Sequence, residues 1–283
     1  MNQKKNRTLY VSDLDGTLLN SNSVLSDTTV EILNNLIDRG TLFTIATART
    51  PATVDGLMKR VHATLPFIVM TGAAQWNGEL VNRRYMRTER MEFLQEVCDK
   101  YGIRPFFYCY NDAEKIINAY HSPVMSECEH QFYDQRVNAP HKRFVLEDVP
   151  TEMHSKAMLM FASAEYEKIE KAYIEAKAAL ACSMTCYHDI FNHETGFFEV
   201  MAEGVSKAAS VAEIARAANA DEIIVFGDSP NDLSMREVAT TFIAPANASP
   251  EVLAVADEVI GTNDSDSVVK WIMADVAKGN HAE

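Results

Sequence analysis

Apolar and polar positions follow a regular alternation along the first third of the chain. Compact apolar runs, which are typical of buried strands, occupy residues 7–13, 41–49 and 66–72. Two stretches with helical character lie between them, at 26–40 and 50–63. Ser26 and Thr50 are the expected N-caps of these helices, and Pro51 suits a first helical position. Strands that alternate with helices of this length predict βαβ units and a parallel sheet.

The alternation changes after residue 71. Asn77 and Gly78 stand between two apolar stretches, which is a strong signal for a β-hairpin. Residues 84–188 then mix two expected helices, at 89–101 and 164–180, with four strand-like runs. Those runs cover residues 104–110, 115–121, 156–163 and 182–188. Because strands and helices do not alternate strictly here, we expect an inserted α+β domain.

Strand–helix alternation resumes in the last third of the chain. A strand leads into a helix at 206–218, and a very apolar strand follows at 222–228. Two short strands and a closing helix are expected at 240–247, 257–262 and 265–278. The pattern therefore predicts an α/β core made of residues 1–83 and 189–283, interrupted by an α+β domain at 84–188.

Composition and charge narrow the function classes. The 283 residues are 47% hydrophobic and 23% charged, as expected of a globular protein, and the net charge is −14. Such a chain should not bind nucleic acid or anionic lipid through bulk charge. Five cysteines without CxxC pairs favour reduced thiols, and we see neither a signal peptide nor an apolar run of ~20 residues. We therefore expect a cytoplasmic protein that needs no membrane and no obligate protein partner.

Charged and hydroxyl residues follow three of the predicted strands. Asp13 and Asp15 come at the end of the first strand, Thr47 at the end of the second, and Asp228 at the end of 222–228. Ligands of open parallel sheets bind at the carboxyl ends of the strands. If these strands are neighbours, Asp13, Asp15, Asp228 and Asp232 gather in one small space.

Four carboxylates in one space require positive charge. At 4 Å and an effective dielectric constant of ~20, each like-charge contact costs about 4 kcal/mol. Mg²⁺ is suited to this role because it prefers one or two carboxylates, waters and a phosphate oxygen. Lys207 offers a second cation, Thr47 a hydroxyl, and the turn at 14–17 backbone N–H groups. The sequence therefore predicts a magnesium-dependent phosphate site.

The two acids of "DLD" can take separate roles at this site. An aspartate is ionised at pH 7 and can attack a phosphomonoester to give an aspartyl-phosphate. A second carboxyl nearby, its pKa raised by like-charge repulsion, can protonate the leaving group and later activate water. We assign the first role to Asp13 and the second to Asp15.

These motifs together resemble a known family. "DLDGT" at 13–17, Thr47, Lys207 and "GDSPND" at 227–232 are similar in kind and order to the four motifs of haloacid dehalogenase-like phosphohydrolases. The placement of the insertion resembles the Cof-type subgroup with its α+β cap. The resemblance implies a Rossmann-like doubly wound core, Mg²⁺ dependence, and hydrolysis of small phosphorylated metabolites, with sugar phosphates as the first guess. The cap would close to exclude water and select the leaving group.

The resemblance also implies roles for individual residues. Asp13 would be the nucleophile and Asp15 the acid/base. Asp13, Asp15 through its carbonyl, and Asp228 would bind the metal. Phosphate or substrate contacts would come from Thr47, Ala48, Lys207 and Asn231, with Arg49 and Asp232 supporting them. This chain departs from the family pattern at Ala48, where glycine is usual, just before Arg49.

Other interpretations of the same residues stay open. A phospho-aspartate signalling module also uses acids, a threonine and a lysine around Mg²⁺, but it is about half this length and has no cap-sized insertion. A phosphomutase on the same scaffold would move the phosphate to a second hydroxyl. "HKRF" at 141–144 is a small basic patch that could meet a substrate phosphate or sugar, but we expect it to be a surface turn.

Overall fold

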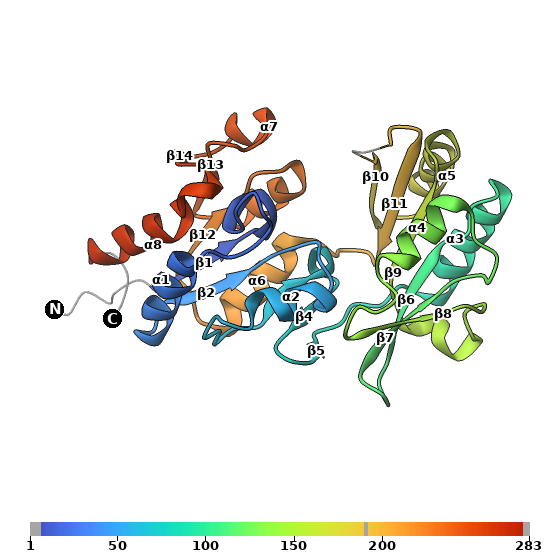
Figure 1. Cartoon of the computed structure of the whole chain (residues 1–283), viewed down its shortest axis with the longest axis horizontal. Coiled ribbons are helices and arrows are strands. Elements are labelled where there is room, and N and C mark those ends of the chain that lie inside the picture. The colour runs from blue at the N-terminus through green and yellow to red at the C-terminus, as the bar shows by residue number, and fades with distance from the viewer. Residues whose placement is uncertain (1–6, 190–191, 280–283) are drawn as a thin grey trace. The chain divides into compact units, whose positions relative to one another are not determined.

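The chain folds into two compact units (Figure 1). The structure is a computed structural model that describes residues 7–189 and 192–279. The first unit contains the described residues up to Thr50, Val54–Val81, and the residues from Ser206 onward. The second contains Pro51–Thr53 and Asn82–Val205. The first unit is therefore discontinuous in sequence.

A parallel sheet forms the centre of the first unit, in the order β14-β13-β12-β1-β2. Its strands are β1 (Thr8–Ser12), β2 (Leu42–Ile45), β12 (Glu222–Phe226), β13 (Thr241–Pro245) and β14 (Glu258–Ile260). The register pairs Thr8 with Glu222 and Ser12 with Phe226, so β1 and β12 end side by side. The residues that follow these two strands must therefore lie close together.

Helices cover both faces of this sheet. In chain order they are α1 (Asp27–Asp38), α2 (Pro51–Met58), α6 (Lys207–Ala217), α7 (Pro250–Leu253) and α8 (Ser267–Ala277). Leu9 and Val11 of β1 share a buried cluster with Val211 and other residues of α6. Tyr10 points the other way, and its hydroxyl donates to Asp275 of α8 at 2.8 Å. Helices on both faces of a parallel sheet make a doubly wound α/β fold.

A small antiparallel sheet follows the second βα unit. It consists of β3 (Phe67–Val69), β4 (Ala74–Trp76) and β5 (Leu80–Val81). The predicted hairpin at Asn77-Gly78 is confirmed, because these residues lie between β4 and β5. A single parallel bridge, Ala46 with Ile68, links β3 to the end of β2.

A six-stranded sheet forms the second unit, in the order β10-β11-β9-β6-β7-β8. Its strands are β6 (Phe106–Asn111), β7 (Ile116–Tyr120), β8 (Lys142–Val145), β9 (Ala157–Glu165), β10 (Ser183–His188) and β11 (Thr195–Met201). The sequence pattern predicted that the inserted domain ends at residue 188 and that residues 189–205 belong to the core. Instead, β11 pairs with β9 and β10, so the second unit extends to Val205.

Helices lie on both faces of this sheet too. They are α3 (Thr88–Lys100), α4 (Glu127–Asp134) and α5 (Tyr166–Ala179). Tyr173 of α5 packs on Phe198, whereas Phe132 of α4 packs on Phe106 and Phe161 on the opposite face. No helix among the described residues is both long and apolar enough to cross a membrane.

Two elements of the second unit differ from the predictions made from the sequence. The surface turn expected at 141–144 is wrong, because Lys142–Val145 form β8, which pairs in parallel with β7. Lys142 is buried in this strand rather than solvated. Helix α4 was not predicted, although Ser126 and Glu129 form a capping box at its start.

Candidate active site

Asp13 lies where β1 ends, and the sheet fixes its backbone. Its N–H donates to the carbonyl of Phe226, the last residue of β12, at 2.9 Å. Only 5% of Asp13 is exposed. The chain then turns through Leu14–Leu18, where Gly16 adopts a φ of +75°. This turn keeps the Asp13 carboxylate at the carboxyl end of β1.

Lys207 brings a fully buried ammonium to Asp13. Its Nζ donates to Asp13 Oδ1 at 2.6 Å and to Asp232 Oδ1 at 2.7 Å. A lysine at a helix start is ordinarily solvated, yet the exposed fraction of Lys207 is 0%. Gly72 allows this placement: a Cβ there, at a φ of +97°, would stand 2.3 Å from the carbonyl oxygen of Ser206. Ser206 in turn caps α6 by accepting from the N–H of Ala209.

Asp228 and Asp232 come from the loop after β12. The Asp232 Oδ2 accepts from the N–H groups of Asp228 and Ser229, at 3.0 and 3.1 Å, so this carboxylate shapes the loop as well as binding Lys207. Asp228 Oδ1 accepts from the Thr17 hydroxyl at 2.7 Å. A Cβ on Gly16 would lie 2.4 Å from Asp228 Oδ2, so the two loops meet only because residue 16 is glycine.

The charges at this site do not balance among the residues themselves. Oxygens of Asp13, Asp228 and Asp232 lie within 4.8 Å of one another, with Lys207 as the cation bonded to two of them. Burial raises the pKa of Asp13, and the Lys207 charge opposes that rise. Burial also raises the pKa of Asp228. Burial acts to lower the pKa of Lys207, but Asp13 and Asp232 outweigh it and hold that pKa above its ordinary value.

The donor set fits a hard divalent cation. Three carboxylates face one ammonium, which leaves an excess of negative charge in a partly buried space. Asp232 is occupied by Lys207 and by backbone N–H groups. Asp13 and Asp228 have the freer carboxylates, and carboxylate oxygens are the ligands that Mg²⁺ prefers. These two residues could therefore hold a magnesium ion.

Asp15 does not join the other acids. Its carboxylate forms a two-pronged ion pair with Arg49, from Nε to Oδ2 at 2.7 Å and from Nη2 to Oδ1 at 2.6 Å. The Asp15 carboxylate raises the pKa of this guanidinium. The expectation that four carboxylates gather is therefore wrong for Asp15. The long Arg49 side chain reaches Asp15 from the loop after β2, so its guanidinium neutralises the Asp15 carboxylate without a metal ion.

The remaining predicted residues line the same end of the sheet. Thr47 is buried, and its hydroxyl oxygen accepts from the N–H of Arg49 at 3.1 Å, which leaves its proton free to donate. Ala48 is exposed on the same loop. Asn231 is exposed and accepts from the Ser229 hydroxyl at 2.7 Å. Sequence reasoning missed the side chain of Thr17, although it stands within the "DLDGT" motif.

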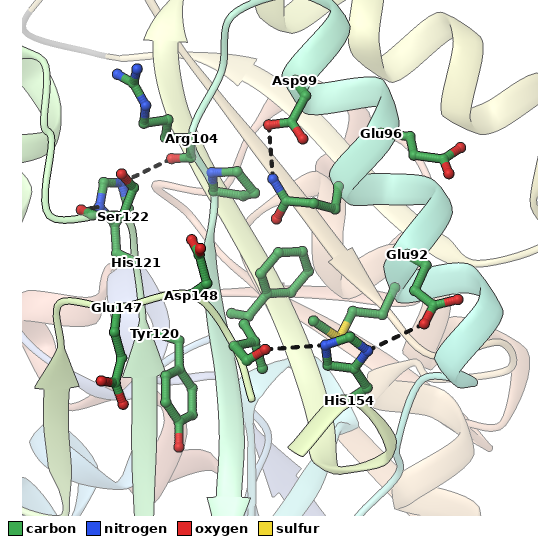
Figure 2. Close-up of a pocket in the computed structure, with 15 residues that line it drawn as sticks. Glu92, Glu96, Asp99, Arg104, Tyr120, His121, Ser122, Glu147, Asp148 and His154 are labelled. Carbon is green, nitrogen blue, oxygen red and sulfur yellow. Dashed lines mark hydrogen bonds and ion pairs between the residues drawn. The ribbon is translucent and has the colours of Figure 1, made fainter. Parts of the chain in front are cut away.

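A cavity of about 530 Å³ lies within the second unit and has a different character. Glu92, Glu96, Asp99, Glu147 and Asp148 line it, together with Arg104 (Figure 2). Some of these groups already have partners: His154 is placed between Glu92 and the carbonyl of Val149. A wall so rich in carboxylates repels phosphate, so this cavity is not the candidate active site.

Comparisons with known proteins find relatives that match most of the chain. A family profile described as haloacid dehalogenase-like hydrolase matches residues 10–272. A 5-amino-6-(5-phospho-D-ribitylamino)uracil phosphatase of Bacillus subtilis is 24% identical, over 93% of this chain and 94% of the relative. A phosphoglycolate phosphatase of Methanoculleus marisnigri is 26% identical, over 93% and 94%.

The solved structures show the fold. A subclass IIB sugar phosphatase of the haloacid dehalogenase superfamily superposes with a TM-score of 0.71 at 22% identity, over 95% of this chain and 99% of that one. A likeness of this extent covers both units and confirms a Rossmann-like α/β core with an α+β insertion.

Proposed function

Because the chain belongs to the haloacid dehalogenase-like hydrolases, we propose that it is a Mg²⁺-dependent phosphomonoesterase acting on small phosphorylated metabolites. Relatives named as phosphatases match the chain over more than nine-tenths of its length, which supports a hydrolase of phosphate monoesters. Sugar phosphates are our first candidates, because a structural neighbour is named as a sugar phosphatase.

One observation carries this proposal: a buried aspartate stands at the end of β1, close to both an ammonium and a second carboxylate. Asp13 accepts from Lys207 at 2.6 Å and lies within 4.8 Å of Asp228. If the pair of Asp13 and Lys207 had only a structural role, it would need neither a third acid nor a position at the open end of the sheet. An aspartate that must attack a phosphate dianion needs cations on the phosphate side, and this site supplies one and could hold another.

The proposed chemistry follows from these positions. An Asp13 oxygen attacks phosphorus, a P–O–Asp13 bond forms, and the ester P–O bond breaks. The Asp15 side chain first leaves Arg49 and takes a proton from solvent, and it then gives that proton to the leaving oxygen. Water then attacks phosphorus, Asp15 takes the proton, and the Asp13 carboxylate and inorganic phosphate separate. Lys207 and the Thr47 hydroxyl bind phosphoryl oxygens during both steps.

When bound, Mg²⁺ would neutralise the phosphoryl oxygens and keep the nucleophile in its carboxylate form. Asp13, Asp228 and the Asp15 carbonyl are its proposed ligands. Thr17 holds Asp228 in place for this role, through the hydroxyl bond at 2.7 Å. In this proposal the first unit is the catalytic core, and the second is the cap that selects the leaving group.

Replacement of the nucleophile is the direct test. Asp13→Asn should lower the release of inorganic phosphate from a sugar-phosphate panel by more than about 1,000-fold, because an amide cannot take the covalent role. Asp38→Asn, at an exposed aspartate of α1, is the matched control. Circular dichroism should show both variants folded. Ordinary turnover by Asp13→Asn would refute the assignment, and transfer of phosphate to a second hydroxyl would favour a phosphomutase.

Removal of the metal is a second test. Dialysis against EDTA should abolish phosphate release, and added Mg²⁺ should restore it, because the excess carboxylate charge then has its counter-ion. Asp228→Asn should raise the Mg²⁺ concentration needed for half-maximal activity. Activity that is indifferent to chelation would contradict the proposed site.

A further inference from the structure

Lys142 is a buried cation that the proposed chemistry does not use. It lies on β8 with 7% of its surface exposed, on the same face of the second sheet as α4. Its Nζ is 4.7 Å from the ring centre of Phe144 and 5.3 Å from that of Tyr108. No carboxylate of the described residues forms an ion pair with it.

A second cation shares this face. Arg136 follows α4, and its guanidinium carbon lies 4.2 Å from the ring centre of Phe132. Its donated bonds go to the carbonyl of Phe132 and the side-chain oxygen of Gln135, both uncharged. Phe132 and Phe144, the rings beside the two cations, have their centres 6.4 Å apart, so Arg136 and Lys142 belong to one aromatic cluster. Burial and the Arg136 charge lower the pKa of Lys142 to about 8.

Glu199 is an acid on this face, and its hydrogen bonds go to hydroxyl groups. Glu199 on β11 accepts from the hydroxyl of Tyr187 at 3.2 Å and from that of Thr185 at 3.5 Å. Neither cation reaches it as an ion pair. In a chain with a net charge of −14, two neighbouring cations without a carboxylate are an unusual arrangement.

Burial without a partner makes this arrangement costly. An ammonium removed from water destabilises the fold unless an anion or good hydrogen bonds compensate it. The aromatic rings compensate in part. Among the described residues, the fully buried side-chain nitrogen and oxygen atoms without a partner are the hydroxyl oxygens of Ser249 and Ser267. The Lys142 ammonium is not one of them, so it is largely but not completely removed from water. An anion from solution can therefore reach it.

We propose that Lys142 and Arg136 form an oxyanion site that selects ligands carrying a second anionic group, a carboxylate or a phosphate. This inference rests on the proposed function, in which the second unit selects the leaving group. The preferred substrates are then phosphate esters whose leaving group is itself anionic.

Matched pairs of ligands test the inference. The pairs are glycerol 3-phosphate with 3-phosphoglycerate, glucose 6-phosphate with 6-phosphogluconate, and fructose 6-phosphate with fructose 1,6-bisphosphate. Binding is measured by calorimetry on the full-length Asp13→Asn protein, so that no turnover is needed. At least one anionic member should bind more tightly than its partner, and Lys142→Met should reduce that preference about 10- to 100-fold, as for a lost charged hydrogen bond.

Two further variants make the result decisive. Arg136→Gln, at a less buried position, should also reduce the preference, and it serves if Lys142→Met does not fold. Arg143→Met is the matched control, because Arg143 is the next residue of β8 and bonds exposed Glu114. Equal binding within every pair, or a preference unchanged by Lys142→Met and Arg136→Gln, would overturn the inference. Because binding is measured without catalysis, failure of the proposed hydrolysis gives a separate result.

Discussion

Asp13 and Asp15 stand two residues apart, but their side chains meet different cations. Asp13 is buried against Lys207, whereas Asp15 is half-exposed against Arg49. The intervening turn, with Gly16 at positive φ, directs them apart. Their proposed roles need this separation, because a nucleophile must be fixed and an acid/base must move between two steps.

Lys142 offers a test of burial at the residue scale. Its pKa in the folded protein, about 8, lies below the ordinary value of about 10.4. Between these values the unfolded chain binds the proton and the folded chain does not, so folding stability rises with pH. At pH 7 Lys142 is protonated in both the folded and the unfolded chain, so the full free-energy cost of burying the charged ammonium remains. Wild-type stability should therefore rise between pH 8 and 10, relative to Lys142→Met, by at most about 3 kcal/mol.

Urea unfolding at a series of pH values measures this difference. The comparison with Lys142→Met removes the effects of other titrating groups, and Arg143→Met again serves as the control on the same strand. A difference between wild type and Lys142→Met that stays constant from pH 7 to 10 would contradict the burial of an uncompensated ammonium.

The sequence predicted that Asp13, Asp228 and Asp232 gather, but it wrongly added Asp15 and did not show how these residues pair. The carboxyl ends of neighbouring parallel strands meet at one edge of the sheet, so the sequence could predict that Asp13 and Asp228 lie close together. The direction of the Asp15 side chain depends on the φ and ψ of a turn and on the reach of Arg49, which spacing does not encode. Likewise, a lysine at a helix start is expected to be solvated, because the sequence does not show that Asp13 and Asp232 bind Lys207 in the interior.

At the scale of elements, the turn after β1 depends on close approach between two loops. Residues 14–18 from one end of the chain and 228–232 from the other are joined by the Thr17–Asp228 bond. The side chain of any other residue at position 16 would occupy the space of the Asp228 carboxylate.

Gly16→Ala should therefore damage the site more than the fold. The positive φ costs about 1–2 kcal/mol for a residue with a Cβ, and the methyl group would displace Asp228 from its place. We expect a loss of phosphate release with a modest fall in melting temperature. Gly56→Ala is the control, because Gly56 lies in α2 with nothing within 4 Å of a Cβ. Equal activity of the two variants would refute the close approach.

Most elements were predictable because their periodicity is strong. The strands of the core sheet alternate with amphipathic helices, and Ser26 caps α1 as expected. The failures are instructive. β8 is a short edge strand whose sequence is half charged, and β11 has the pattern of a core strand but pairs within the second unit. Pairing partners, and not propensity, decide such cases.

At the scale of the whole molecule, each unit has a sheet and a buried core of its own. The strands of the second unit pair only with one another in the described residues. Leu94, Phe106, Met158 and Phe198 are completely buried within it. An independent core is the usual condition for a part of a chain to fold alone.

Residues 82–205, expressed alone, should thus fold. We expect far-ultraviolet circular dichroism of a mixed α/β protein and a single cooperative thermal transition. The full chain is the control, and its melting curve should contain this transition. A broad, non-cooperative melt of the isolated segment would show that its core depends on the first unit.

The position of β1 between β2 and β12 has one consequence for biosynthesis. β1 pairs with β2 on one edge and with β12 on the other, and its partners across the second edge are 214 residues away in sequence. A ribosome adding about 5–20 residues per second needs on the order of ten seconds or more to deliver that partner. During this interval the nascent β1 presents an apolar, unpaired edge, which is the kind of surface that chaperones protect from aggregation.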